Sequence, residues 1–199
     1  AQITKLSNTQ NRIDGKDFVA LDRNQERLRM ELSFAGIQYL YKSGAKLDDL
    51  EHQITLDETI IAQACLSAEL SIVALAKGNI GALTENIEKP PYKSLFNSGT
   101  NSFSLYNGVQ VLRTVDRLLK QHEATSTGRK RLVLVHGNRF LLHLILGKIK
   151  ATDGFGTKYL SNECIATLVN EHFQTQWDSV FDAMEAKFPD AYPSYLFRN

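Results

Sequence analysis

The chain has 199 residues, 43% of them hydrophobic, which is enough to bury the core of one large or two small globular units. Its 23 basic and 22 acidic residues give a formal net charge of +1, which excludes a general electrostatic attraction to nucleic acid or an anionic membrane. Such a partner must therefore bind a local patch. Cys65 and Cys164 lie far apart in apolar helical patterns, so we expect two buried free thiols and a reducing, cytoplasmic location.

The first predicted helix begins at Asp22 and ends before Gly36. Asp22 lies three residues before Gln25, the spacing at which an N-cap residue and the third helical residue cap each other's backbone. Gly36 suits the left-handed conformation that ends many helices. Alternating side chains from Ile37 to Lys42 then predict a short strand. We expect this strand to pair with residues outside the sequence or to form a small hairpin against the helices.

Longer helical segments follow. Thr55 and Glu58 match a capping box and predict a helix that continues through Leu75 and closes at Gly78. Apolar stripes separated by polar or glycine-containing loops predict three further helices, over residues 104–121, over residues 129–150 and from an N-cap at Asn162 onward.

The longest apolar run, over residues 132–149, is interrupted by His136, Asn138, Arg139 and His143, whereas a membrane helix needs about 20 predominantly apolar residues. We therefore expect a core helix and no membrane partner. The N-terminus has no basic region leading into an apolar stretch, as a signal peptide would. Because the chain also begins without methionine, we expect a fragment of a longer protein.

These elements together predict a mainly α, multi-helix domain with a minor strand or hairpin element near residues 37–42. We expect residues 1–50 to pack on a helical body formed by residues 51–199. The alternative is one continuous domain over the whole chain.

An amide-rich turn, an acid-capped helix and a short aromatic strand follow one another in the first 42 residues. The residues that carry this pattern are Asn8, Thr9, Gln10, Asn11, Asp17, Phe18, Asp22, Gln25 and the run from Gly36 to Lys42. The pattern resembles the signature of the abortive-infection phage-resistance (AIPR) family, of which the chain looks like the C-terminal portion. Looser similarity covers Ala62-Gln63-Ala64, Tyr92 to Phe96 and the closing residues 195–199.

The resemblance implies a role in anti-phage defence but no particular reaction. In that family a strand-rich half lies upstream, and some members carry a restriction-endonuclease-like domain before it. The polar residues of the motif are candidates for binding nucleic acid, because amide side chains can read base edges. The candidates are Asn8, Gln10, Asn11, Asp17 and Gln25. The alternative is structural, since asparagines suit tight loops and the cap already explains Gln25.

Arg131 and His136 have the Arg-x4-His spacing that resembles the motif of HEPN ribonucleases. On an ideal helix their side chains lie roughly 140° apart, and Leu132 stands where that family usually has a polar residue. The alternative is a basic helix start that leads into a buried helix. His136 and His143 share a helix face without a nearby carboxylate, so we expect no metal.

The densest basic cluster is Arg129-Lys130-Arg131, which could bind phosphates. It contains no aromatic residue for base stacking, and the acidic residues from Asp178 to Asp190 could pair with it instead. The sequence contains no Gly-x-Ser-x-Gly elbow and no phosphate-binding Gly-x-x-x-x-Gly-Lys loop, so we expect no cofactor.

Three hypotheses for function follow. The first is a helical binding or assembly module of a phage-defence protein, with any catalysis in an upstream domain or a partner. The second is a metal-independent ribonuclease that uses Arg131 and His136. The third is a protein-interaction scaffold. The candidate partners are a nucleic acid, a partner protein and a second copy of the chain.

Overall fold

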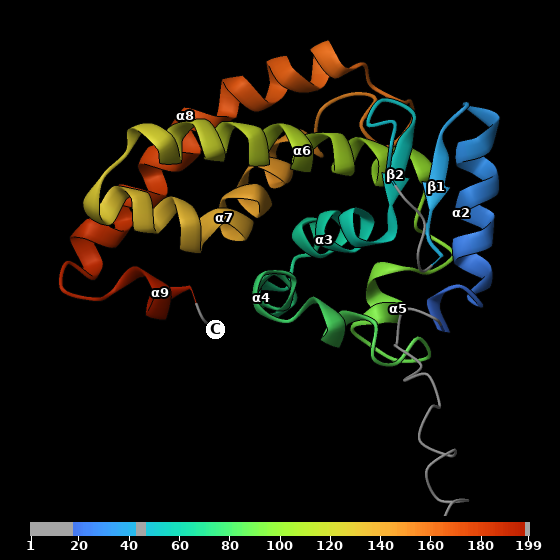
Figure 1. Ribbon diagram of the computed structural model, residues 1–199, viewed down its shortest axis with the longest axis horizontal. Coiled ribbons are helices and arrows are strands. Elements are labelled where there is room, and N and C mark those ends of the chain that lie inside the picture. The colour runs from blue at the N-terminus through green and yellow to red at the C-terminus, as the bar shows by residue number, and fades with distance from the viewer. Residues whose placement is uncertain (1–17, 43–46, 198–199) are drawn as a thin grey trace, which may run out of the picture.

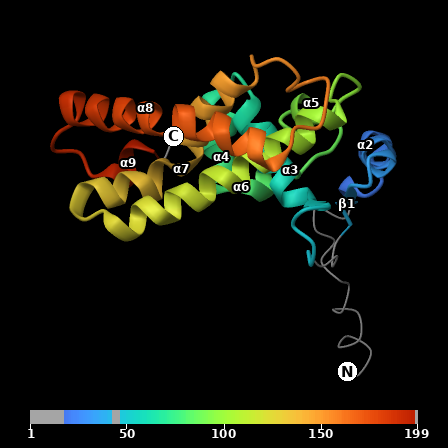
Figure 2. The same cartoon turned by 90° about the horizontal axis from the view of Figure 1, so that it is seen from above.

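The computed structural model describes residues 18–42 and 47–197. This part of the chain is mainly α-helical with one two-stranded sheet, which confirms the predicted architecture (Figure 1). Helices α6 and α7 run side by side and α8 packs against both. Helix α2 and the strands lie at one end of the molecule, and α9 lies towards the other (Figure 2). The elements are α2 (Arg23–Phe34), β1 (Gln38–Leu40), β2 (Gln53–Thr55), α3 (Leu56–Leu66), α4 (Leu70–Gly78), the 3-10 turn η2 (Ile80–Leu83), α5 (Tyr92–Leu95), α6 (Ser102–Thr125), α7 (Gly128–Ile149), α8 (Asn162–Lys187) and α9 (Pro193–Leu196).

The predicted limits of α2 are confirmed. The Asp22 side chain accepts a hydrogen bond from the backbone N–H of Asn24 at 3.0 Å. At the other end Gly36 has a φ of 74°, and the N–H of Ile37 donates to the carbonyl of Leu32 at 3.0 Å. This is the backbone pattern of a helix closed by a left-handed residue, for which glycine has no steric cost.

The predicted hairpin of the short strand is wrong. Strand β1 pairs in parallel with β2, with Gln38 opposite Gln53, so the two strands do not form the predicted hairpin. The Asp49 carboxylate accepts the backbone N–H groups of Glu51 and His52 and so fixes the turn that leads into β2. Because β2 has only three residues, it leaves no alternating pattern in the sequence.

The predicted helix from Thr55 to Gly78 is broken in two. The capping box is confirmed, since Thr55 and Glu58 cap each other's backbone at the start of α3. Helix α3 ends at Leu66 because the next residue, Ser67, is extended and its hydroxyl accepts the N–H of Glu69 at 3.1 Å. A separate helix, α4, begins at Leu70. It ends at Gly78, the predicted end of the helical segment.

Helix α7 is long and apolar enough to cross a membrane by length and composition, the one such helix in the described part of the chain. It packs on α3, α4, α6, α8 and α9, and 44% of its most apolar window is buried. Core helices of soluble proteins have the same length and composition, so the packing agrees with the predicted core helix.

The buried apolar side chains form two clusters. One joins α2, the strands and α3 to the start of α6, and the other joins the rest of α6 to α7 and α8. The described residues before position 50 therefore pack on the helical body. Cys65 is buried and free, as predicted, but Cys164 is free and exposed. Ser161, and not Asn162, is the N-cap of α8, which places Cys164 in the first, solvent-facing turn.

Candidate functional site

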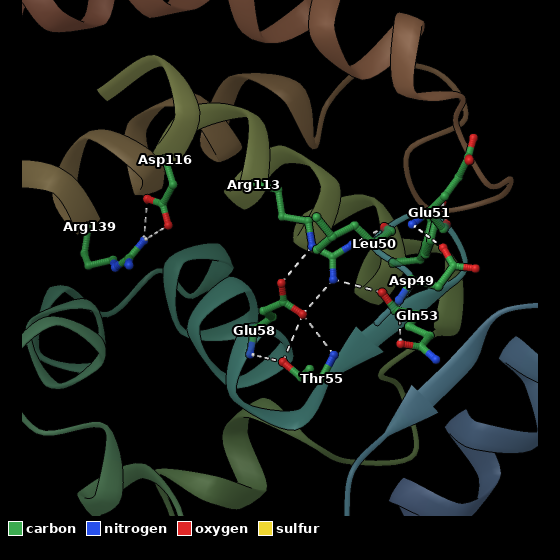
Figure 3. Close-up of polar contacts among 10 residues, drawn as sticks. Asp49, Leu50, Glu51, Gln53, Thr55, Glu58, Arg113, Asp116 and Arg139 are labelled. Atoms are coloured by element: carbon green, nitrogen blue, oxygen red, sulfur yellow. Dashed lines mark hydrogen bonds and ion pairs between the residues drawn. The ribbon is translucent and has the colours of Figure 1, made fainter. Parts of the chain in front are cut away.

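A guanidinium cluster joins α6 to the sheet and to the start of α3 (Figure 3). Arg113 on α6 donates to both carboxylate oxygens of Glu58, at 2.7 and 2.8 Å. It also donates to the carbonyl oxygens of Leu50 at 2.5 Å and Gln53 at 2.8 Å. Planar, bidentate contacts of this kind fix both direction and distance. Arg113 therefore positions the 47–53 segment beside α6.

Burial opposes the ionisation of Glu58, but Arg113 and the backbone of Thr55 outweigh it and lower the pKa of the carboxyl group. The side chains of Arg113 and Glu58 are 17% and 20% exposed. Glu58 is therefore charged at neutral pH and holds Arg113 at the edge of the core, so that Arg113 does not carry free charge.

The polar face of α6 forms the floor of a groove with a volume of about 880 Å³. Its floor residues recur every three or four positions and so lie on one side of the helix: Gln110, Arg113, Thr114, Arg117, Lys120 and Gln121. Leu50 and Glu51 from the turn before β2 and Asn162 from the start of α8 form the walls. Residues 110 to 121 span about 16 Å along the helix. The groove is thus open and elongated, and most of its lining residues are polar.

The groove carries free positive charge. Arg117 and Lys120 are exposed, and neither has a hydrogen bond or ion pair within residues 18–42 and 47–197. Asp116 beside them is already paired, since it accepts from Arg139 of α7 at 2.9 Å (Figure 3). Glu51 on the wall is the remaining carboxylate of the lining. Arg117 and Lys120 contribute two positive charges on α6, and Glu51 contributes one negative charge on the wall. The unpaired charges of the groove therefore sum to about one positive charge.

Gln110 adds a buried hydrogen-bond donor to the groove. The residue is 5% exposed, and its Nε2 has no hydrogen-bond partner in the described part of the chain. A buried, unpaired amide costs about 1 to 3 kcal/mol, so natural proteins keep few of them without a reason. An acceptor atom of a bound ligand would satisfy Gln110 once its side chain turned into the groove.

Gln25, predicted both as a cap and as a binding residue, lies in the core. It is fully buried, its Nε2 donates to the Tyr92 hydroxyl at 2.9 Å, and its Oε1 accepts from the Tyr39 hydroxyl at 2.7 Å. The reciprocal cap on Asp22 is therefore not formed. Tyr92 also donates to the Asp22 carboxylate at 2.7 Å, and burial raises the pKa of both tyrosines. This network joins α2 and β1 to α5.

The three residues of the basic cluster all have intramolecular partners. Arg129 pairs with Glu185 at 2.5 Å and donates to two carbonyls of the 188–191 turn. The ammonium of Lys130 lies 5.2 Å from the ring centre of Phe181. Arg131 pairs with Glu123 at 3.0 Å. These contacts tie α7 to α8 and to the end of α6, and they neutralise much of the charge that a phosphate would meet.

Arg131 and His136 face different neighbours. Arg131 is exposed beside Glu123, whereas burial and the nearby Lys77 lower the pKa of His136. His143 contacts the Cys65 carbonyl through Nδ1 at 2.9 Å. Within residues 18–42 and 47–197, no three His, Cys, Asp or Glu side chains are grouped closely enough to hold a metal ion.

Burial raises the pKa of the Cys65 thiol to about 12. The thiol is therefore protonated at neutral pH, which makes it a poor nucleophile. It lies against α7, where its Sγ contacts the Arg139 carbonyl at 3.6 Å.

Four predicted binding residues, Asn8, Gln10, Asn11 and Asp17, lie outside the described residues. The groove on α6 was not predicted. A signal for it does exist in the sequence, because the polar residues at 110, 113, 114, 117, 120 and 121 repeat with helical spacing opposite the apolar stripe. The burial of Gln110 depends on the walls and has no sequence signal. No protein-family model, no curated protein and no solved structure matches this chain.

Proposed function

We propose that this chain is a helical binding module of a cytoplasmic bacterial phage-defence protein, and that it holds a nucleic-acid backbone in the groove on α6. The resemblance of residues 8–42 to the AIPR signature supports the biological context. The groove supports the ligand: two unpaired cations and a buried, unpartnered amide donor line one face of one helix. Any catalysis belongs to an upstream domain or to a partner.

The chemistry of the groove suits a backbone better than a base. Arg117 and Lys120 supply positive charge for phosphates, while Thr114, Gln121 and Asn162 supply hydroxyl and amide groups for phosphate or sugar oxygens. Among the described residues no aromatic side chain lines the groove, so they supply no base stacking there. We therefore expect weak sequence preference and strong dependence on salt.

The double variant Arg117→Glu, Lys120→Glu tests this proposal. Labelled single-stranded RNA and DNA are titrated with the protein at several salt concentrations, and binding is followed by fluorescence anisotropy. For the parent chain, log K is expected to fall linearly with log salt. The double variant is expected to bind at least about tenfold more weakly and to have a salt slope smaller in magnitude by about 1 to 2.

The matched control is Lys89→Glu, Lys187→Glu, which makes the same change in net charge at exposed positions away from the groove. It is expected to bind nearly as well as the parent chain. Equal losses in both double variants would contradict the groove as the binding site. No binding at low salt would contradict the proposal as a whole and would favour the scaffold hypothesis, which sedimentation at several protein concentrations would then test for self-association.

The ribonuclease hypothesis makes the opposite prediction for His136. If the groove binds nucleic acid and this chain carries no active centre, His136→Ala leaves RNA affinity unchanged and the parent chain leaves labelled RNA intact. RNA cleavage by the parent chain that disappears in His136→Ala, with unchanged thermal stability, would instead support a HEPN-like site with Arg131 and His136. Separation of labelled RNA on a denaturing gel distinguishes the two results.

A further inference from the structure

A second hollow lies on the chain and shares no lining residue with the groove on α6. It has a volume of about 700 Å³, which is within the usual range for small-molecule sites. Three parts of the chain line it: the segment that leads into α6, one side of α3, and the connection after α7. The residues used below are Gln63, Leu66, Leu95, Asn101, Lys150 and Phe155.

The polar lining of this hollow favours an anion. None of its lining residues is acidic, and Lys150 has no ion pair within the described residues. The hollow also lies at the N-terminus of α6, a helix of 24 residues capped by Asn101. Aligned backbone dipoles leave partial positive charge at such a terminus, which adds to the ammonium of Lys150.

Gln63 points to a ligand independently of the charge. Its Nε2 is buried and has no hydrogen-bond partner in the described part of the chain. The same residue lines the hollow, so a turn of its side chain would bring the amide to an acceptor atom of a bound molecule. Leaving the amide unpaired costs stability, which an apolar residue of similar size would avoid.

The rest of the lining supplies apolar surface. Side chains that do not line the hollow hold its two rims in place by hydrogen bonds. Leu66 offers surface for an uncharged, planar part of a ligand, whereas Leu95 and Phe155 are only 3% and 2% exposed and add little area. Arg27 on α2 donates to the carbonyls of residues 97 and 100 at 3.2 and 2.7 Å, which fixes the rim before α6. The opposite rim is fixed by Asn107, which donates to the Phe155 carbonyl at 2.8 Å. A preformed site of this kind binds with little ordering cost.

We infer that this hollow binds a small phosphate-bearing organic molecule of nucleoside-monophosphate size. The phosphate lies at Lys150 and the start of α6, an acceptor atom of the ligand takes the Gln63 amide, and the ring lies against the apolar wall. The site does not depend on nucleic-acid binding in the groove on α6.

Isothermal titration calorimetry with adenosine monophosphate tests the inference, with adenosine and inorganic phosphate as separate ligands. The monophosphate is expected to bind more tightly than either part alone. Lys150→Gln is expected to weaken its binding about tenfold or more, because glutamine keeps a hydrogen-bond donor but lacks the positive charge that strengthens a bond to phosphate. The matched control Lys148→Gln, exposed on the same helix and outside the lining, is expected to bind like the parent chain.

Gln63→Met provides a second, independent readout. Because it removes an unpaired buried amide, it is expected to raise the thermal midpoint of the free protein while it weakens binding of the monophosphate several-fold. The absence of monophosphate binding at millimolar concentration, or unchanged affinity in Lys150→Gln, would overturn the inference. Inorganic phosphate that binds as tightly as the monophosphate would also overturn it, since the apolar wall would then have no role. The groove variant Arg117→Glu, Lys120→Glu should retain the binding, which separates this site from the proposed function.

Discussion

Asn107→Leu is expected to reduce the free energy of unfolding by about 3 to 5 kcal/mol, one of the two largest effects of a single substitution that we predict. Asn107 is fully buried on α6 and makes three hydrogen bonds with the connection between α7 and α8. Its Nδ2 donates to the carbonyls of Phe155 and Lys158, both at 2.8 Å, and its Oδ1 accepts the N–H of Leu160 at 2.9 Å.

The size of the effect follows from what the substitution leaves behind. Leucine has a similar volume, so the loss of stability comes from polar groups and not from packing. The carbonyls of Phe155 and Lys158 and the N–H of Leu160 lose their hydrogen-bond partner, and most of these groups remain buried away from water. Each lost hydrogen bond contributes about 1 kcal/mol and each stranded buried group costs about 1 to 3 kcal/mol. Urea unfolding followed by the fluorescence of Trp177, the one tryptophan of the sequence, measures the change.

Asn107→Asp separates hydrogen bonding from packing. The carboxylate would face two carbonyl oxygens in a buried position, so its pKa in the folded state should rise above the unfolded value of about 3.9. A raised folded pKa gives stability that is fully present below the unfolded pKa and is lost as the pH rises through the folded pKa. Asn107→Asp should therefore recover stability on acidification, whereas Asn107→Leu should not. Asn170→Leu on the exposed side of α8 should change stability by less than about 0.5 kcal/mol.

Local signals in the sequence predicted the helix boundaries well where the capping chemistry is local. The capping box at Thr55 and the C-terminal glycine of α2 both work through backbone groups within a few residues of each other. The break at Ser67 was missed because the apolar pattern continues through it. A single serine hydroxyl that bonds Glu69 decides the break, and that contact does not alter the periodicity.

Contacts between distant residues account for the remaining errors. The spacing of Asp22 and Gln25 fits a local cap, but Gln25 instead bonds Tyr92, which lies 67 positions away. Likewise the groove on α6 needs the turn at Leu50 and the start of α8 to form its walls. The polar stripe on α6 could have been predicted from the sequence, whereas its depth, and the burial of Gln110 within it, depend on packing that periodicity does not encode.

Arg113→Met is expected to reduce the free energy of unfolding at neutral pH by about 2 to 4 kcal/mol, because it leaves the largely buried Glu58 carboxylate without its cation. The carbonyls of Leu50 and Gln53 also lose their donor, so the wall of the groove should loosen as well. Urea unfolding at pH 7 measures the first effect, and hydrogen exchange over residues 47–55 measures the second.

The pH dependence identifies Glu58 as the coupled group. In the parent chain the pKa of Glu58 is lowered, so its contribution to stability is present above the unfolded pKa of about 4.5 and is lost as the pH falls through the folded pKa. In Arg113→Met only the hydrogen bonds from Thr55 oppose burial, so the pKa of Glu58 should rise above its value in the parent chain, and this variant should lose less stability than the parent chain as the pH falls towards about 4. The difference between the two proteins should therefore shrink on acidification.

Glu58→Gln and the double variant complete the thermodynamic cycle. Glu58→Gln should flatten the acid limb of the stability profile, because the titrating group is gone. Adding Arg113→Met to Glu58→Gln should cost clearly less than Arg113→Met costs alone, since no buried carboxylate is then left unpaired. Equal costs in the two backgrounds, or a parent–variant difference that stays constant from pH 7 to about 4, would show that Arg113 acts through its carbonyl contacts and not through Glu58. The ion pair would then have no part in shaping the groove.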